Sequence, residues 1–93
     1  FADLRLDSLR REVTVNQQTV ALRTQEFELL AIFLAQPGVA FERERLLALA
    51  WGYDFYGQTR TVDVHVAQLR KKLAGSRAKI ETVAGIGYKL VEA

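Results

Sequence analysis

The stretch from Thr59 to Gly75, TRTVDVHVAQLRKKLAG, limits the fold of this chain more than any other, because it predicts one amphipathic helix with two different faces. At about 100° per residue, four apolar side chains fall within one narrow sector that suits a protein core. These are Val62, Val66, Leu69 and Leu73. The opposite sector mixes cations, hydrogen-bonding groups and small apolar side chains, namely Arg60, Val64, Ala67 and Lys71, flanked by Thr61, Asp63, Gln68 and Arg70. That mixture suits the major groove of DNA, and a plain solvated helix face is the alternative.

Three short segments near the N-terminus alternate apolar with polar residues, a pattern typical of strands exposed on one face. They run from Leu4 to Asp7, from Glu12 to Asn16 and from Thr19 to Arg23. Asn16-Gln17-Gln18 is acceptable as a tight hairpin turn between the last two. Residues 1–23 are therefore expected to form a small antiparallel sheet.

Two further helices are predicted before the amphipathic one. Thr24 can cap the first, and Pro37-Gly38 ends it. Its core-facing residues recur at helical spacing: Phe27, Leu30, Ala31 and Leu34, widened by Leu29 and Phe33. The second spans Glu42 to Ala50, with Leu46, Leu47 and Ala50 inward and Leu49 more exposed, after a possible three-residue strand from Val39 to Phe41. The three helices occupy residues 24–75, the last of them 60–74.

The C-terminal segment from Lys79 to Val91 contains two β-rich runs around a glycine-containing turn. The glycine pair in this turn is expected to supply positive φ for a hairpin. Two helices joined by the loop Tyr53 to Gln58 and followed by such a hairpin form the arrangement in which the second helix enters a DNA groove. The hairpin would then lie beside the DNA backbone as a wing.

Length and composition allow one domain, over residues 1–93. Ninety-three residues with 49% hydrophobic content are enough for a single core and too few for two. The lack of cysteine excludes disulfides, thiol nucleophiles and cysteine-based zinc sites, and suits a reducing compartment, so a cytoplasmic location is expected. Neither a membrane-spanning run nor a signal peptide is visible. Since the first residue is Phe1, the sequence is expected to be a piece of a longer protein.

Charge is distributed unevenly along the chain. Residues 1–59 contain six lysines and arginines against eight acidic residues, and residues 60–93 contain seven against three, giving −2 and +4. The basic C-terminal third suggests a polyanionic partner.

The sequence predicts no catalytic residues, no metal site, no cofactor and no small-molecule substrate or membrane partner. His65 is the only histidine and has no cysteine to accompany it, so it cannot found a metal site of ordinary ligand count. Neither a Ser-His-Asp set nor a paired-carboxylate pocket is discernible. Gly85-Ile86-Gly87 precedes no helix and so lacks the context of a phosphate-binding glycine loop.

Four stretches, in order and covering essentially the whole chain, resemble the effector domain of OmpR/PhoB-type response regulators: LRTQEFELL, RERLLALAWGYDF, RTVDVHVAQLRKKL and IETVAGIGYKL. The resemblance implies an α+β winged helix-turn-helix with a small N-terminal antiparallel sheet, three helices and a C-terminal β-hairpin wing, behind a receiver domain that this chain lacks. It further implies transcription regulation in a two-component phosphorelay, dimeric binding to tandem promoter half-sites in double-stranded DNA, and association with the nucleoid when bound. RNA polymerase would be contacted through the loop of Tyr53, Asp54, Phe55 and Tyr56.

The resemblance also implies roles for single residues. Positions matching phosphate contacts can each donate a hydrogen bond and are Trp51, Arg60, Thr61, His65, Arg70, Thr82 and Tyr88. Lys71 joins them because it lies on the Arg60 side of the helix. Base-facing positions are Val64, Ala67 and Gln68, where glutamine suits adenine and small apolar groups suit the thymine methyl. The wing tip corresponds to Ala84, Gly85, Ile86 and Gly87.

This chain departs from arginine-rich relatives at several positions. Ala67 and Gln68 stand where such relatives carry arginine in the helix, and Ala84 stands where the wing tip carries one. Glu42 replaces a Ser or Thr cap at the start of the second helix. We expect lower DNA affinity or heavier dependence on the receiver for dimerisation, and a preference for A·T-leaning sites.

Some of these residues also have a structural interpretation. Asp63 is expected to be a carboxylate favoured by the helix dipole rather than a base reader. His65 would pack on the wing or contact a phosphate, Trp51 would serve both core and contact, and Lys72 would be either a solubility charge or a DNA contact. The alternative to DNA reading is a winged-helix module for protein contact, with Leu49 and the aromatic loop as its interface.

Overall fold

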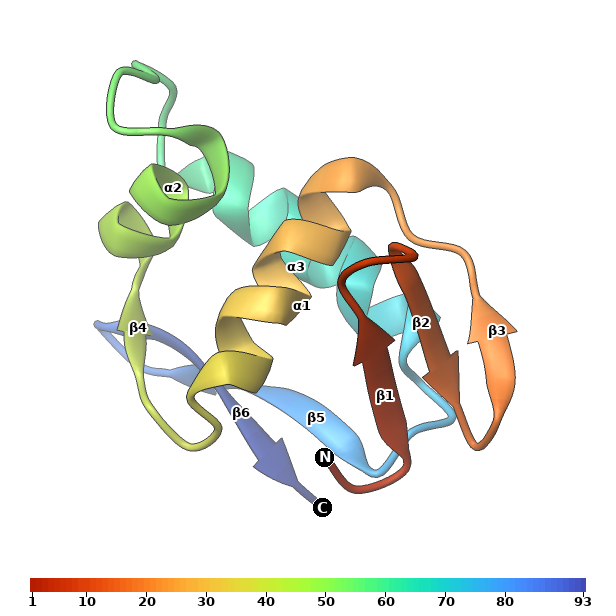
Figure 1. The fold of residues 1–93 in the computed structure, drawn as a ribbon. Helices are drawn as coiled ribbons and strands as arrows, with labels where there is room; N and C mark the ends of the chain where they lie inside the picture. The colour runs from red at the N-terminus through yellow and green to blue at the C-terminus, as the bar shows by residue number, and fades with distance from the viewer.

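A computed structural model describes residues 1–93 and arranges three helices with two antiparallel sheets (Figure 1). The elements, in chain order, are β1 (Leu4–Asp7), β2 (Glu12–Val15), β3 (Gln18–Val20), α1 (Thr24–Ala35), β4 (Phe41–Glu42), α2 (Arg43–Trp51), α3 (Arg60–Lys72), β5 (Ala78–Val83) and β6 (Gly87–Glu92). The first sheet has the order β1-β2-β3 and the second β4-β6-β5. The predicted α+β fold with an N-terminal sheet, three helices and a C-terminal hairpin is therefore confirmed.

The N-terminal sheet is a meander in which the β2–β3 turn consists of Asn16 and Gln17. Both residues have positive φ, 51° and 69°, and Val15 pairs with Gln18, the geometry of a type I′ turn. The prediction of a third strand from Thr19 to Arg23 was wrong at both ends, since β3 is Gln18–Val20. The chain leaves the sheet after Val20, and residues 21–23 connect it to the start of α1 at Thr24.

Helix α1 begins at Thr24, with Arg23 as its N-cap, so the prediction that Thr24 caps the helix was wrong. The Glu26 carboxylate accepts a hydrogen bond of 2.8 Å from the Arg23 backbone amide, which closes the helix start in place of a Thr hydroxyl. Glu26 is only 1% exposed and also accepts a bond of 2.6 Å from Lys72 Nζ. Lys72 at the end of α3 thus pairs with the start of α1, a structural role that differs from both predicted alternatives, a solubility charge and a DNA contact.

After α1, β4 starts two residues later than predicted and α2 starts one residue later. Gly38, at φ 82°, redirects the chain, and its amide bonds to the Leu90 carbonyl of β6 at 2.8 Å. The short strand is Phe41–Glu42 instead of Val39 to Phe41, because these two residues are the ones that pair with Tyr88 and Gly87. Glu42 ends this strand and is also the N-cap of α2, which therefore spans Arg43–Trp51 rather than Glu42 to Ala50.

The core is formed by the inward faces of the three helices and both sheets, to which the N-terminal sheet contributes Leu4 and Val13. Val62, Val66, Leu69 and Leu73, the predicted apolar sector of the amphipathic helix, are all buried. Leu46 and Leu47 of α2 are buried too, whereas Leu49 is exposed, as predicted. Helix α3 ends at Lys72, earlier than residue 74, because the chain turns there and buries Ser76.

The two ends of the chain meet beside β5 (Figure 1). Asp3 accepts a hydrogen bond of 2.6 Å from the Ser76 hydroxyl and others from the Arg77 amide, while the Ala93 amide bonds to the Arg77 carbonyl. The C-terminal hairpin runs from Ala78 to Glu92, one residue beyond the expected range at each end. None of the helices has the length and apolar character needed to cross a membrane.

Candidate nucleic-acid interface

The outward face of α3 carries the three predicted base-reading residues together. Val64, Ala67 and Gln68 are all exposed, and Val64, an apolar residue, has 51% of its surface accessible. Arg60 and Lys71 are exposed on the same helix and form no ion pair with the protein. The exposed face of α3 therefore presents two cations without ion-pair partners around a strip with few polar groups.

Trp51, Thr61 and His65 form one cluster at the junction of α2 and α3. His65 Nδ1 lies 2.8 Å from the Thr61 carbonyl oxygen, which can only accept, so Nδ1 carries the hydrogen and Nε2 is left available. The imidazole packs edge-on against Trp51, with ring centroids 5.0 Å apart. The expectation that His65 packs on the wing was wrong: its aromatic partner is in α2.

Arg70 connects α3 to the hairpin. Its Nε donates to the Ile80 carbonyl at 2.9 Å and its Nη2 donates to the Thr82 hydroxyl at 2.7 Å. Its guanidinium carbon also lies 5.2 Å from the centroid of the Tyr88 ring, within range of a cation–π contact. Both partners of these hydrogen bonds are neutral, so Arg70 keeps its net charge while it holds the hairpin.

Tyr88 and Asp63 meet beneath this surface. The Tyr88 hydroxyl donates to Asp63 Oδ1 at 2.6 Å, and Arg43 Nε donates to the same oxygen at 2.8 Å. Burial raises the pKa of Asp63, but the bonds from Tyr88 and Arg43 and the charge of Arg43 outweigh burial and lower it. Burial and the neighbouring carboxylate both raise the pKa of Tyr88. Asp63 is therefore an ionised carboxylate that accepts two hydrogen bonds from the protein, which supports its structural interpretation.

Arg43 is the residue of this surface that sequence reasoning missed. It is the first residue of α2, and in the sequence it is one of two arginines near the helix start. Its importance depends on the pairing of Phe41 with Tyr88, which brings the start of α2 against β6. That pairing joins segments 47 residues apart, so no local pattern reveals it.

The hairpin turn consists of Ala84, Gly85 and Ile86, all exposed. Gly85 has φ 74°, as a turn glycine should, and the Ile86 amide bonds to the Val83 carbonyl at 3.0 Å. Gly87 has no positive φ and belongs to β6, so the expectation of a glycine pair with positive φ holds for Gly85 alone. A Cβ at position 87 would lie 2.0 Å from the Phe41 carbonyl oxygen, so glycine is required there by the close approach of β4.

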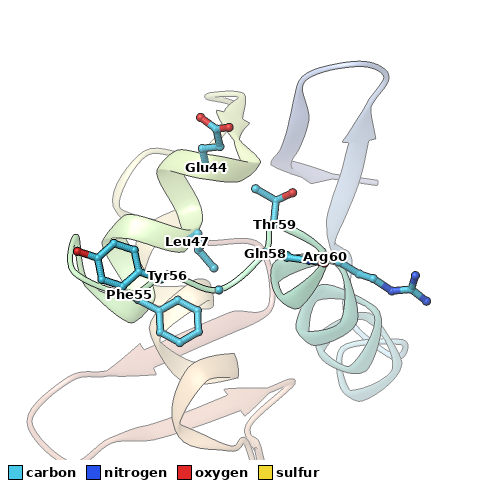
Figure 2. Close-up of a pocket in the computed structure, with 8 residues that line it drawn as sticks. Glu44, Leu47, Phe55, Tyr56, Gln58, Thr59 and Arg60 are labelled. Atoms are coloured by element: carbon cyan, nitrogen blue, oxygen red, sulfur yellow. The ribbon is translucent and has the colours of Figure 1, made fainter.

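The loop between α2 and α3 presents aromatic side chains to solvent. Tyr53 and Tyr56 are largely exposed, Tyr56 at 97%, whereas Phe55 packs against Trp51 with centroids 6.3 Å apart. The loop borders an open groove that reaches from Glu44 and Leu47 of α2 to the start of α3 (Figure 2). Figure 2 shows the Arg60 side chain directed away from this groove. The aromatic loop and the Arg60 side chain therefore face different sides of the domain.

The chain is similar to known proteins in both sequence and structure. A family model described as the C-terminal part of transcriptional regulatory proteins matches residues 17–90. The transcriptional regulatory protein VxrB of Vibrio cholerae is 44% identical over 89 residues, which is 96% of this chain and 36% of that protein. The heme response regulator HssR of Staphylococcus aureus is 42% identical over 92 residues, 97% of this chain and 41% of that protein. The chain thus spans about two fifths of the length of these curated relatives.

A solved structure aligns over nearly the full chain. It is the DNA-binding domain of RstA from Klebsiella pneumoniae in complex with the RstA box, with a TM-score of 0.85 and 34% identity. The alignment covers 98% of this chain and 93% of that one.

Proposed function

Because this chain belongs to the OmpR/PhoB family of response-regulator effector domains, which bind DNA and regulate transcription, we propose that it binds double-stranded promoter DNA with α3 in the major groove and the β5–β6 hairpin along the backbone or minor groove. The observation that carries this proposal is the outward face of α3, where exposed small and amide side chains lie between two cations without ion-pair partners.

Base reading is assigned to Val64, Ala67 and Gln68. All three are exposed and none is engaged in a side-chain hydrogen bond within the protein. The Gln68 amide can bind adenine through two hydrogen bonds, and the apolar pair can contact thymine methyl groups. With no arginine among the three, readout favours A·T-leaning half-sites.

Phosphate binding is assigned to groups around the edge of this face. Arg60 and Lys71 supply charge, and Arg70 supplies charge from a fixed position against the hairpin. The Thr61 and Thr82 hydroxyls and the Trp51 indole are neutral donors that fix register on the backbone. Because Nδ1 carries the hydrogen of the neutral imidazole, His65 Nε2 can donate to a phosphate only when the ring is protonated. Tyr88 differs from the rest of the predicted set, because its hydroxyl proton is already donated to Asp63.

The remaining partners follow from the family and from the length of the relatives. We propose that a receiver domain precedes this chain, that two copies occupy tandem half-sites, and that the protein is associated with the nucleoid when bound. RNA polymerase contact is assigned to Tyr53, Asp54, Phe55 and Tyr56. The Tyr53 and Tyr56 side chains are largely exposed, and the Arg60 side chain of α3 is directed away from this loop. A purely protein-binding module is the alternative, and the same loop would then be its main interface.

Selection of bound duplexes from a random pool tests the proposal. The 93-residue chain should enrich one A·T-leaning motif, and the receiver-linked protein should enrich two direct repeats of it, about one helical turn apart. Enrichment of no motif, together with no binding to any duplex at low salt, would favour the protein-binding alternative.

A further inference from the structure

We propose that Tyr88 and Asp63 form a positioning pair that sets the hairpin against the recognition helix α3, and that Tyr88 acts in DNA binding through this pair instead of contacting a phosphate. The inference rests on the proposed function, since it concerns how the DNA-binding surface is held in shape. It changes the role of one predicted phosphate contact and adds Asp63 and Arg43 to the residues on which binding depends.

Hydrogen-bond chemistry argues against a direct phosphate contact. Phosphate oxygens only accept hydrogen bonds, so a tyrosine hydroxyl can bind one only by donating its single proton. In the structure that proton is donated to Asp63 Oδ1 at 2.6 Å, a short bond to an ionised acceptor. Tyr88 is also only 5% exposed. To reach a phosphate it would have to leave an ionised carboxylate partly unpaired, which costs free energy in a half-buried site.

Tyr88 is instead placed where all the DNA-facing elements meet. It lies on β6, opposite Phe41 of β4 and Thr82 of β5, and its hydroxyl bonds to α3. The guanidinium carbons of Arg43 and Arg70 lie 5.4 and 5.2 Å from its ring centroid, within range of cation–π attraction. The ring therefore contacts one cation from α2 and one from α3, and each of these cations is held by a second bond.

Those second bonds connect the pair to the surface. Arg43 bonds to Asp63 at 2.8 Å, which neutralises a carboxylate that would otherwise face the DNA backbone with an unpaired negative charge. Arg70 bonds to Ile80 and Thr82 of β5, so the position of the Thr82 hydroxyl depends on the position of Arg70. A shift of Tyr88 would therefore disturb two proposed phosphate contacts, the Arg70 side chain that packs on its ring and the Thr82 hydroxyl that Arg70 holds.

A double-mutant cycle in DNA binding tests the pair. Tyr88→Phe, Asp63→Ala and the double variant are compared with the original chain on its selected duplex, at a temperature well below unfolding. Each single change should weaken DNA binding by roughly tenfold, the order of typical coupling between contacting residues. The double variant should bind DNA almost as tightly as the single variant with the lower affinity. Asp63→Asn keeps an acceptor oxygen for Tyr88 and should recover most of the loss.

Amide chemical shifts of the free chain provide a second measurement if a variant is too unstable for binding studies. Tyr88→Phe and Asp63→Ala should then shift the same amides in the hairpin and in the first turn of α3. Shifts confined to the neighbours of each substituted residue would overturn the inference.

Two binding outcomes would also overturn it. If Tyr88→Phe weakens binding equally in the original and the Asp63→Ala backgrounds, the hydroxyl contacts DNA directly. If the variants lower the melting temperature but leave affinity unchanged, the pair is structural only. Absence of DNA binding by the original chain itself would instead refute the proposed function, so binding by the original chain is measured before that of the variants.

Discussion

Gln68 and Lys71 lie within one turn on the exposed face of α3 but differ in what they can recognise. The Gln68 amide can discriminate between bases, whereas the Lys71 ammonium, with no ion-pair partner in the protein, can bind any phosphate. Gln68→Ala should cost about 1–3 kcal/mol on the best duplex and relax the preference at one position. Lys71→Ala should weaken selected and random duplexes alike and reduce the salt slope by about 1.

Fluorescence titration of both variants against one selected and one random duplex measures this difference. Lys71→Ala is the matched control for Gln68→Ala, since both side chains are exposed and their truncation should leave stability unchanged. Equal losses on both duplexes for Gln68→Ala would mean that the reading face is centred elsewhere on α3.

Residue roles could be predicted from the sequence where they depend on helical geometry alone. The division of α3 into a core face and an exposed face follows from a 3.6-residue period, and the structure has the same division. The engagement of Tyr88 by Asp63, the contribution of Arg43 and the stacking of His65 on Trp51 could not be predicted, because each joins residues from different elements. Those contacts depend on how the elements are packed, which a period does not specify.

At the scale of elements, the hairpin is attached to the helices through β4, and Gly87 permits that attachment. A Cβ there would lie 2.0 Å from the Phe41 carbonyl oxygen, and both groups are backbone, so neither can rotate away. Gly87→Ala should therefore lower the free energy of unfolding by about 3 kcal/mol, and the melting temperature by roughly 10–20 °C. Thermal and urea unfolding measure the change.

Gly75→Ala is the matched control for this substitution. Position 75 has no neighbouring atom within 4 Å of an added Cβ and no positive φ, so its free energy of unfolding should change by less than about 0.5 kcal/mol. If the two alanine variants are equally stable, the β4–β6 pairing is looser than the structure has it.

The aromatic loop can be tested separately from α3 if the substituted residue is chosen by its contacts. Phe55 packs on Trp51, a proposed phosphate contact, so a change there affects both surfaces. Tyr56 is 97% exposed, so Tyr56→Ala in the receiver-linked protein should reduce transcription activation and leave DNA affinity unchanged. Activation assays paired with DNA titrations measure this, and a parallel loss of DNA binding would argue against separate surfaces.

Element types were predictable from periodicity and turn residues, while element boundaries were not. The starts of α1 and α2 were displaced by one residue because Glu26 caps α1 from within and Glu42 is both the end of β4 and the N-cap of α2. The end of β3 was displaced because the alternating pattern continues past the point where the chain leaves the sheet. At α2 a tertiary contact decides the boundary, because Glu42 pairs with Gly87 of β6, whereas at α1 a local bond from the Arg23 amide to Glu26 decides it.

At the scale of the whole molecule, the Glu26–Lys72 pair joins the start of α1 to the end of α3. Burial raises the pKa of Glu26, but the bond from Lys72, the bond from the Arg23 amide and the nearby charges outweigh it and hold the pKa below its ordinary value. A carboxyl whose pKa is lower in the folded chain than in the unfolded chain stabilises the fold at pH values above its unfolded-state pKa. That contribution is lost as the pH falls through its folded-state pKa. The free energy of unfolding should therefore decline below about pH 4.5, the ordinary value for this group.

Lys72→Met tests this contribution, because it leaves the buried carboxylate without its cation. It should cost about 2–3 kcal/mol at pH 7, less than for a fully buried pair because Lys72 is partly exposed. The cost should shrink toward pH 3, where protonated Glu26 no longer needs a counter-charge. Lys71→Met removes the same charge from an exposed neighbour without an ion pair and is the control. Urea unfolding at several pH values measures both, and a pH-independent gap would contradict the account.

The uneven charge of the chain, with its excess of cations after residue 59, favours binding of the DNA backbone by α3 and the hairpin. Binding of the selected duplex should release counterions from about four to six phosphates, so log K should fall against log salt with a slope of roughly −4 to −5. A slope near zero, or no binding to any duplex at low salt, would contradict it.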